Sequence, residues 1–428
     1  MENRTKSHWK IAGVLAIAAA SFASSAHAGY DEKASTDSDS VSSNSSMSQS
    51  SMSQDSMSNS SKSSDSSMAM KTSMKTDAPM SSKMVVSSPR LTTMALGGRT
   101  RNQVRYVDPQ MKAVLISLME LKPKPIEKLT PAQARRQPGP ADAVKRTLQK
   151  QGRSTVPEAV GSVMDTTVPG PAGRIPVRVY KPITSNSDKL PVLVYFHGGG
   201  FVIAGVQAYD SSCRALANAA KCMVVSVDYC YAPEHRLPAA HEDSYAATQW
   251  VMNNVEKWGG DHSRVAVGGE SAGGNLATDM CLMARDRGGK MPIYQMLVYP
   301  LVDFTPASAN APSVRANAYA KPLNRAMLGW FGGYALPRKS FAFNPLASPL
   351  KRANLRGLPA ATVVLAEIDP LLSQGEAYVR KLRASGVPVR AKLYKGVTHE
   401  FFGMGAVINQ AKDAVNFAAE GLDSAFNR

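Results

Sequence analysis

Apolar and polar positions follow two alternating spacings through most of the chain after about residue 106. Short apolar runs typical of buried strands occur at 176–180, 192–196, 223–227, 265–268, 293–299, 361–366 and 389–394. Between most of them lie longer stretches with helical spacing, at 211–219, 240–256, 272–285 and 376–384. Strands that alternate with helices predict a mostly parallel sheet covered on both faces, which is an α/β fold.

Two segments depart from this alternation. Asp108-Pro109 precedes an apolar-periodic stretch through Leu115, Leu118 and Met119, which predicts a helix with proline at its start. The segment 305–344 is long and contains no clear strand. We expect it to be an insertion that lies over the sheet edge as a lid.

The first 28 residues have the pattern of a signal peptide. A basic start with Arg4, Lys6 and Lys10 precedes an apolar run at 11–23, and the small-residue site Ala26-His27-Ala28 follows. We therefore expect cleavage after about Ala28 and an exported protein, periplasmic or secreted. An uncleaved anchor is the alternative. The run is shorter than the roughly 20 residues of a bilayer span, and no second long apolar stretch follows, which predicts no transmembrane span in the mature protein.

Residues 29–100 form a second segment that is dominated by serine and methionine. Large aliphatic residues are nearly absent, so the segment cannot bury enough apolar surface to offset the entropy of ordering. We expect a disordered arm that acts as a linker. The alternative is that its methionine thioethers bind Cu(I), a soft ion that they suit.

The formal net charge of +17 is concentrated early in the chain. Between residues 90 and 153, lysine and arginine far outnumber the four acids Asp108, Glu120, Glu127 and Asp142. No aromatic interleaving or nucleic-acid motif accompanies them, so we predict a solvated basic face and no nucleic-acid partner. Attraction to the anionic cell-envelope surface is the alternative.

Cysteine spacing indicates neither a metal site nor a redox motif. Export permits a disulfide without requiring one. No C-x-x-C or metal-ligand spacing occurs, so we expect small buried core residues at all four positions, Cys213, Cys222, Cys230 and Cys281.

The clearest chemical motif is Gly269-Glu270-Ser271-Ala272-Gly273, which follows a strand-like run and precedes a helical stretch. A lone G-x-S-x-G is weak evidence, but the strand before it and the helix after it are the context of a nucleophile elbow. The glycines allow a tight turn that exposes the serine hydroxyl. The start of the helix then places positive dipole beside a developing anion.

A second motif, His197-Gly198-Gly199-Gly200-Phe201, comes directly after the strand 192–196. Glycines leave backbone N–H groups accessible to a tetrahedral oxyanion, which such donors stabilise. An ordinary glycine-rich turn is the alternative, and the elbow downstream favours the oxyanion interpretation.

A catalytic base and its acid should follow the serine along the chain. The only histidine after Ser271 is His399, which we place in a loop beyond the strand ending near residue 394. Asp369 opens the loop after the preceding strand, from which it can reach that histidine. Asp303 and Glu367 remain open as structural partners.

These motifs, taken in order with Asp369-Pro370-Leu371 and the final His399, resemble the bacterial hormone-sensitive-lipase-like esterases, a branch of the α/β-hydrolases. The resemblance covers most of the chain after about residue 106. It implies a catalytic domain over 101–428, with a helical cap from about 106–160 and 305–345.

The resemblance also assigns roles within the two glycine motifs. It implies that the N–H groups of Gly199, Gly200 and Ala272 form the oxyanion hole. His197 would brace the loop, and the remaining motif positions, Gly198, Gly269, Glu270 and Gly273, would support the geometry.

Three positions depart from the family pattern. Cys230 stands where arginine is usual, Glu270 where aspartate or threonine is common, and Ser373-Gln374 where an acidic pair is usual. None belongs to the predicted triad or oxyanion glycines. Pocket shape and substrate preference therefore cannot be transferred closely from the family.

Together these residues predict a serine carboxylesterase that cleaves short- to medium-chain acyl esters through an acyl-enzyme on Ser271. No metal or organic cofactor is expected. The alternatives are a hydrolase of the same fold for lactones, amides or acetylated sugars, and a non-catalytic small-molecule receptor. The terminal strand at 389–394 offers an edge on which a homodimer could pair, and the sequence leaves the oligomeric state open.

Overall fold

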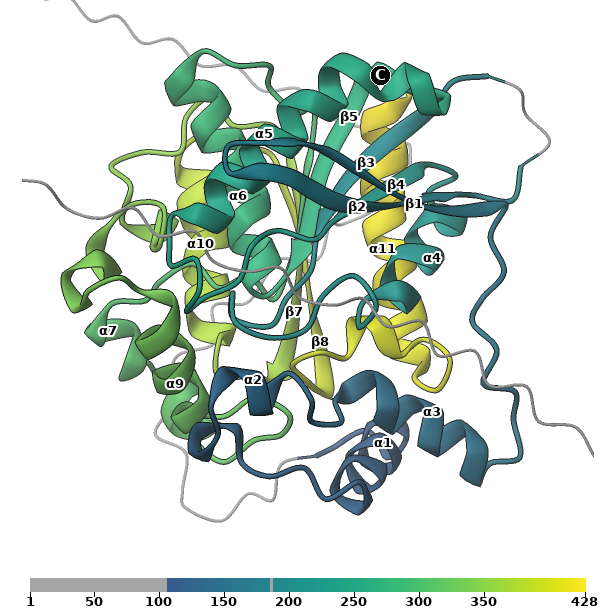
Figure 1. Cartoon of the computed structure of the whole chain (residues 1–428). Helices are drawn as coiled ribbons and strands as arrows, with labels where there is room; N and C mark the ends of the chain where they lie inside the picture. The colour runs from purple at the N-terminus through teal and green to yellow at the C-terminus, as the bar shows by residue number, and fades with distance from the viewer. Residues whose placement is uncertain (1–105, 185–187) are drawn as a thin grey trace, which may run out of the picture. The chain divides into compact units, whose positions relative to one another are not determined.

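The computed structural model describes residues 106–184 and 188–428, all within the compact unit Ala95–Arg428 (Figure 1). The predicted signal peptide (1–28) and the serine- and methionine-rich arm (29–100) lie outside these described residues. In the described part of the chain, no helix has the length and apolarity that crossing a membrane requires.

An eight-stranded sheet forms the centre, in the order β1-β2-β4-β3-β5-β6-β7-β8. Strand β1 pairs antiparallel with β2, and β2 pairs antiparallel with β4, whereas all later pairings are parallel. The strands are β1 Ser162–Gly170, β2 Gly173–Lys181, β3 Leu190–Phe196, β4 Met223–Val227, β5 Gly260–Glu270, β6 Gln295–Val298, β7 Ala361–Ile368 and β8 Val389–Thr398. The predicted mostly parallel sheet is therefore confirmed.

The hydrophobic pattern failed to identify β1. This strand is at the edge of the sheet, and its first four residues are exposed, so no buried alternation marks it. It also contains Pro169, which sequence rules treat as a strand breaker except at edges and bulges. Only its antiparallel pairing with β2, closed by a tight turn between Gly170 and Gly173, makes it a strand.

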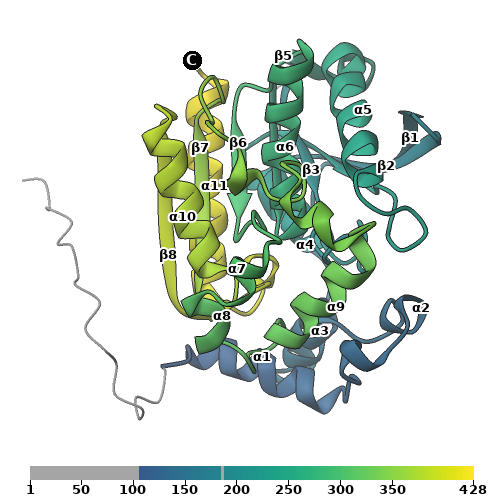
Figure 2. The same cartoon turned by 90° about the vertical axis from the view of Figure 1, so that its left-hand side faces the viewer.

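Helices cover both faces of the sheet (Figure 2). Side chains from α5, α6 and α10 share one core cluster with Val192 and Val194 of β3, while α4 and α11 share the other with Leu193 and Tyr195. The period of two along β3 thus divides its side chains between two cores. The covering helices are α4 Asp210–Ala219, α5 Ala239–Asn254, α6 Ala272–Arg287, α10 Leu372–Ala384 and α11 Asn409–Phe426, and the 3₁₀ turn η2 Val255–Trp258 extends α5.

The first helical group precedes the sheet in sequence and comprises α1 Pro109–Glu120, η1 Ile126–Lys128, α2 Pro131–Ala134 and α3 Pro140–Lys150. The predicted first helix is confirmed. Asp108 caps it, since its Oδ1 accepts hydrogen bonds from the N–H groups of Gln110 (2.9 Å) and Met111 (3.1 Å).

The second helical group runs from β6 to the adjacent strand β7 and comprises α7 Pro306–Ala309, α8 Pro312–Ala316, α9 Arg325–Ala335, η3 Lys339–Phe343 and η4 Pro349–Lys351. The indole N–H of Trp330 in α9 donates to the carbonyl of Leu129 at 3.0 Å, which joins the two groups. In both views α9 lies beside α1–α3 at the same end of the molecule (Figures 1 and 2).

The four cysteines are free thiols. Three of them are buried in the core, as expected, and Cys230 is partly exposed. Burial raises the pKa of the Cys222 thiol to about 12, so at neutral pH this thiol is un-ionised and packs as an apolar group.

Candidate active site

Ser271 stands at a sharp turn between β5 and α6. Its backbone has φ 57° and ψ −115°, a conformation that non-glycine residues rarely adopt and that here turns the side chain away from the strand. A Cβ on Gly269 would lie 2.4 Å from the Gly273 carbonyl oxygen, and a Cβ on Gly273 would lie 1.9 Å from the Phe196 carbonyl oxygen. Both glycines are therefore required by close packing around the serine.

Two adjacent parallel strands bring an acid and a histidine to this serine. Strand β7 ends just before Asp369, and β8 ends just before His399. The histidine Nε2 lies 3.0 Å from Ser271 Oγ, and its Nδ1 lies 2.7 Å from Asp369 Oδ2. The apolar pattern predicts an end of β8 near residue 394. The strand continues to Thr398, so the histidine follows it directly.

The side chains of these three residues are buried, and nearby carboxylates change the pKa of the histidine. Ser271, His399 and Asp369 are 6%, 3% and 0% exposed. Burial alone would lower the pKa of His399, but the nearby carboxylates, foremost that of Asp369, together outweigh it, and the pKa is raised from its ordinary value. The second carboxylate oxygen of Asp369 accepts the N–H of Leu371 at 2.7 Å, which fixes its orientation.

The two alternative acids have other partners. Glu367 Oε2 accepts the N–H of Gly396 at 2.8 Å. Asp303 Oδ1 accepts the N–H of Thr305 at 2.8 Å, and its Oδ2 lies 3.2 Å from Lys351 Nζ. Asp303 therefore holds the loop after β6, and Glu367 joins β7 to β8, and neither bonds the histidine.

The glycine loop after β3 lies beside Ser271. Gly199 and Gly200 have φ values of +97° and +61°, in the left-handed region that favours glycine. Both residues line the same cavity as Ser271. Within the described residues, no hydrogen bond engages their N–H groups. The N–H of Ala272 lies at the start of α6, directly after Ser271.

His197 supports this loop and does not contact Ser271. Its ring stacks on Tyr229 with centroids 4.3 Å apart, and its Nδ1 lies 2.8 Å from the Gly198 carbonyl oxygen. The Tyr229 hydroxyl in turn donates to the His197 carbonyl at 2.8 Å. Burial lowers the pKa of this histidine.

Glu270, next to the serine, points into the core instead of the cavity. Its carboxyl accepts hydrogen bonds from the hydroxyls of Tyr195 and Tyr299. Burial raises its pKa to about 7. The Tyr299 ring also lies 4.5 Å from the ring of His399, so Glu270 is linked to the histidine through one tyrosine.

Of the other two departures from the family pattern, the Gln374 side chain has a structural role, whereas Cys230 forms a bond through its backbone. Gln374 Oε1 accepts the N–H groups of Val302 (2.6 Å) and Asp303 (2.9 Å) and so holds the loop that follows β6. The N–H of Cys230 donates to Asp243 Oδ2 at 3.1 Å. Gln374 lines the cavity and therefore contributes to its shape.

Sequence reasoning missed Glu400 and Tyr209. The Tyr209 hydroxyl lies 2.8 and 2.9 Å from the two carboxyl oxygens of Glu400, and Glu400 Oε1 lies 3.7 Å from His399 Nε2. Burial raises the pKa of Glu400. Its position immediately after the histidine was the only sequence signal, because the tyrosine is 191 residues away.

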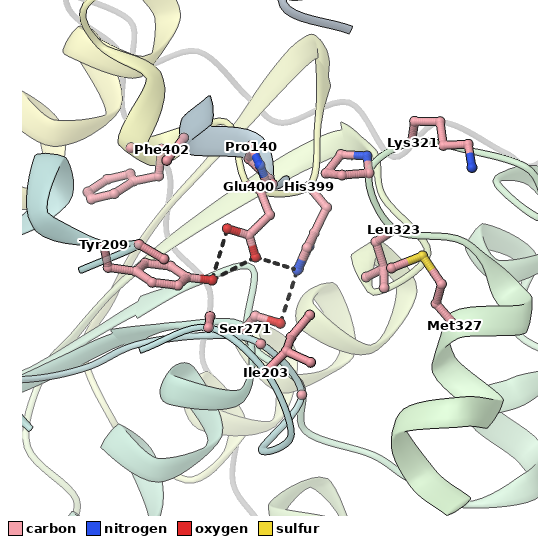
Figure 3. Close-up of a pocket in the computed structure, with 18 of the residues that line it drawn as sticks. Pro140, Ile203, Tyr209, Ser271, Lys321, Leu323, Met327, His399, Glu400 and Phe402 are labelled. Atoms are coloured by element: carbon pink, nitrogen blue, oxygen red, sulfur yellow. Dashed lines mark hydrogen bonds and ion pairs between the residues drawn. The ribbon is translucent and has the colours of Figure 1, made fainter. Parts of the chain in front are cut away.

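A cavity of about 1640 Å³ opens onto Ser271 and His399. Both helical groups contribute to its walls, which makes them a cap over the site. Figure 3 shows Tyr209, Glu400 and Phe402 on one side of the serine and Leu323 and Met327 on the other. In the described part of the chain, no group of three or more His, Cys, Asp or Glu side chains could hold a metal ion.

The fold and this constellation define the class of the α/β-hydrolases. The profile of the family described as alpha/beta hydrolase fold matches residues 193–403. The carboxylic ester hydrolase LipN of Mycobacterium tuberculosis is 39% identical over 58% of this chain and 66% of its own length. Esterase LipI of the same organism is 39% identical over 64% of this chain and 85% of its own.

The similarity to esterases extends to solved structures. The esterase of Pyrobaculum calidifontis is 37% identical, with a TM-score of 0.65 over 74% of this chain and 98% of that one. The chain belongs to the hormone-sensitive-lipase-like family of α/β-hydrolases and is a carboxylic ester hydrolase.

Proposed function

We propose that Ser271 is the nucleophile of this esterase, that His399 is its general base and that Asp369 orients the histidine. The single observation that carries the proposal is the continuous chain of two hydrogen bonds from Asp369 through His399 to Ser271. His399 takes the serine proton as the hydroxyl oxygen attacks the ester carbonyl. The carboxylate of Asp369 stabilises the resulting imidazolium.

The N–H groups of Gly199, Gly200 and Ala272 are proposed to hold the negative oxygen of the tetrahedral intermediate. Their support is the positive φ of the two glycines and the position of Ala272 at the first turn of α6. The protonated His399 then donates to the leaving alcohol oxygen. Water, activated by the same histidine, hydrolyses the acyl-enzyme and releases the acid.

Short- to medium-chain acyl esters are the proposed substrates. The cavity lining includes the apolar side chains of Leu301, Val314, Leu323, Met327, Leu328 and Phe331, and Figure 3 shows Leu323 and Met327 together on one side of Ser271. Burial of a saturated chain there gains about 0.8 kcal/mol per methylene. We propose that this apolar side receives the acyl chain.

The test is hydrolysis of p-nitrophenyl esters, from acetyl to long-chain acyl groups, by the wild type and Ser271→Ala. Removal of the nucleophile should lower kcat by roughly 10⁴- to 10⁶-fold. Ser424→Ala is the matched control, because this exposed serine on α11 bonds only the Glu420 carbonyl within the described residues. An equal rate for wild type and Ser271→Ala would refute the assignment.

We also propose export with cleavage after about Ala28, supported by the basic, apolar and small-residue order of residues 1–28. Cell fractionation and N-terminal sequencing of the mature protein test this. A cytoplasmic protein that begins at Met1 would refute it.

A homodimer paired through β8 is a further proposal. This strand is at the edge of the sheet, and its Leu393 is 39% exposed. An unpaired strand edge is a ready template for a second copy. Sedimentation of the wild type and Leu393→Asp tests this, and a monomeric wild type at micromolar concentration would contradict it.

A further inference from the structure

Glu400 is held over the active site by its backbone and by a tyrosine. Its φ of +68° lies in the left-handed region, which is costly for a glutamate. Its side chain, 18% exposed, lines the cavity and accepts a hydrogen bond from Tyr209. Gly198 makes room for that tyrosine, because a Cβ there would lie 2.3 Å from the tyrosine hydroxyl oxygen.

The carboxyl of Glu400 and the hydroxyl of Ser271 approach the same nitrogen. His399 Nε2 lies 3.0 Å from Ser271 Oγ and 3.7 Å from Glu400 Oε1, and Figure 3 shows the nitrogen between the two groups. In the proposed function, on which this inference rests, Nε2 donates its proton to the leaving alcohol oxygen. That oxygen must lie about 3 Å from Nε2, and so the alcohol portion of the ester passes beside Glu400.

The cavity wall formed by α4 and α11 carries polar groups among apolar ones. Its polar residues are Ser211 and Asn218 from α4, and Lys412 and Asn416 from α11, and they stand beside Ala215, Ala219 and Val415. Hydroxyl and amide groups suit an uncharged, hydroxylated ligand.

We propose that Glu400, positioned by Tyr209, recognises a hydroxyl group on the carbon next to the ester-bearing carbon of the alcohol. Such a hydroxyl lies roughly 3 Å from the ester oxygen and can donate to Glu400 Oε1 at hydrogen-bond distance. A carboxyl oxygen accepts in both protonation states. The substrate class is therefore the monoesters of vicinal diols and polyols, such as monoacylglycerols or sugar monoesters.

The experiment compares two butyrate esters that differ by one group, 2-hydroxyethyl butyrate and n-propyl butyrate, by acid release in a pH-stat. In the wild type, kcat/KM should favour the hydroxylated ester by roughly tenfold or more. In Glu400→Leu the ratio should fall to about one, and Tyr209→Phe should lower it as well. p-Nitrophenyl butyrate, whose leaving group carries no such hydroxyl, reports whether each variant keeps a folded site.

The matched control is Glu127→Ala, which removes a carboxylate that lines the same cavity but should leave the ratio at its wild-type value. A wild-type ratio near one, or a ratio unchanged in Glu400→Leu, would overturn the proposal. The wild type could also prefer 2-(trimethylammonio)ethyl butyrate over its neutral isostere 3,3-dimethylbutyl butyrate. If that preference exceeded the preference for 2-hydroxyethyl over n-propyl butyrate, the proposal would be overturned, since the group recognised would then be a cation. Loss of p-nitrophenyl hydrolysis in Ser271→Ala tests the proposed function separately, so failure of one proposal is distinguishable from failure of the other.

Discussion

Replacement of Asp369 by asparagine should inactivate the enzyme with little change in its fold. In the wild type, one carboxylate oxygen accepts from His399 Nδ1 at 2.7 Å and the other accepts from the N–H of Leu371 at 2.7 Å. An asparagine has only one acceptor oxygen for these two donors. If that oxygen stays with Leu371, the amide NH₂ faces Nδ1 and forces the proton onto Nε2, where it blocks acceptance of the Ser271 proton.

In the transition state the His399 imidazolium would then be a buried charge without its charged partner, which costs about 3 to 5 kcal/mol. Each 1.36 kcal/mol is tenfold in rate, so kcat/KM for p-nitrophenyl butyrate should fall by roughly 10²- to 10⁴-fold. The carboxylate also raises the pKa of His399. Loss of the carboxylate should therefore lower the pKa of His399. Because the histidine must be neutral to act as a base, the acid limb of the pH profile should move to lower pH.

The assay is kcat/KM measured from about pH 5 to about pH 9, a range that includes the titration of histidine. Thermal unfolding checks that the variant keeps its fold. Glu367→Gln is the matched control, because this acid lies near the end of the same strand, β7, but bonds the backbone of Gly396. A loss below about tenfold in Asp369→Asn, with the acid limb unmoved, would refute the reasoning. An equal loss in Glu367→Gln would show that the activity responds to disruption of the contact between β7 and β8 rather than to loss of the histidine's partner.

Two further changes have predicted outcomes. Gly200→Ala should lower kcat on the order of 10²-fold with little change in KM. The added Cβ would lie 2.3 Å from the Phe331 ring and would displace an oxyanion donor. The control is Gly333→Ala on α9, where the added Cβ meets nothing within 4 Å. Glu270→Gln should gain stability relative to wild type as the pH rises. The raised pKa of Glu270, about 7, means that its contribution is full below about 4.5 and is lost as pH rises through 7. Urea unfolding at pH 5 and 8.5 measures both proteins, and a difference that is independent of pH would contradict this prediction.

Much of the fold could be predicted from the sequence, because the hydrophobic patterns of its buried strands and helices are local. Buried parallel strands such as β3 and β4 are continuous apolar runs, and helices such as α6 carry long periodic patterns. The edge strand β1 was not readable, since it has neither a buried face nor a continuous apolar run. The end of β8 was also missed, because Lys395 and Gly396 interrupt its apolar pattern while pairing with β7 continues to Thr398.

By itself the sequence determined the elbow at Ser271, the glycine loop and the choice of histidine. These depend on residue types that the backbone turn and the chemistry demand within a few positions of one another. Only the tertiary structure excluded Glu367 as the partner of that histidine. Asp369 bonds His399 directly, whereas Glu367, two residues earlier, bonds the backbone of Gly396 within β8. The tertiary structure also decided that Glu400 faces the cavity, because that orientation depends on Tyr209, a residue from a distant helix start that no local pattern connects to it.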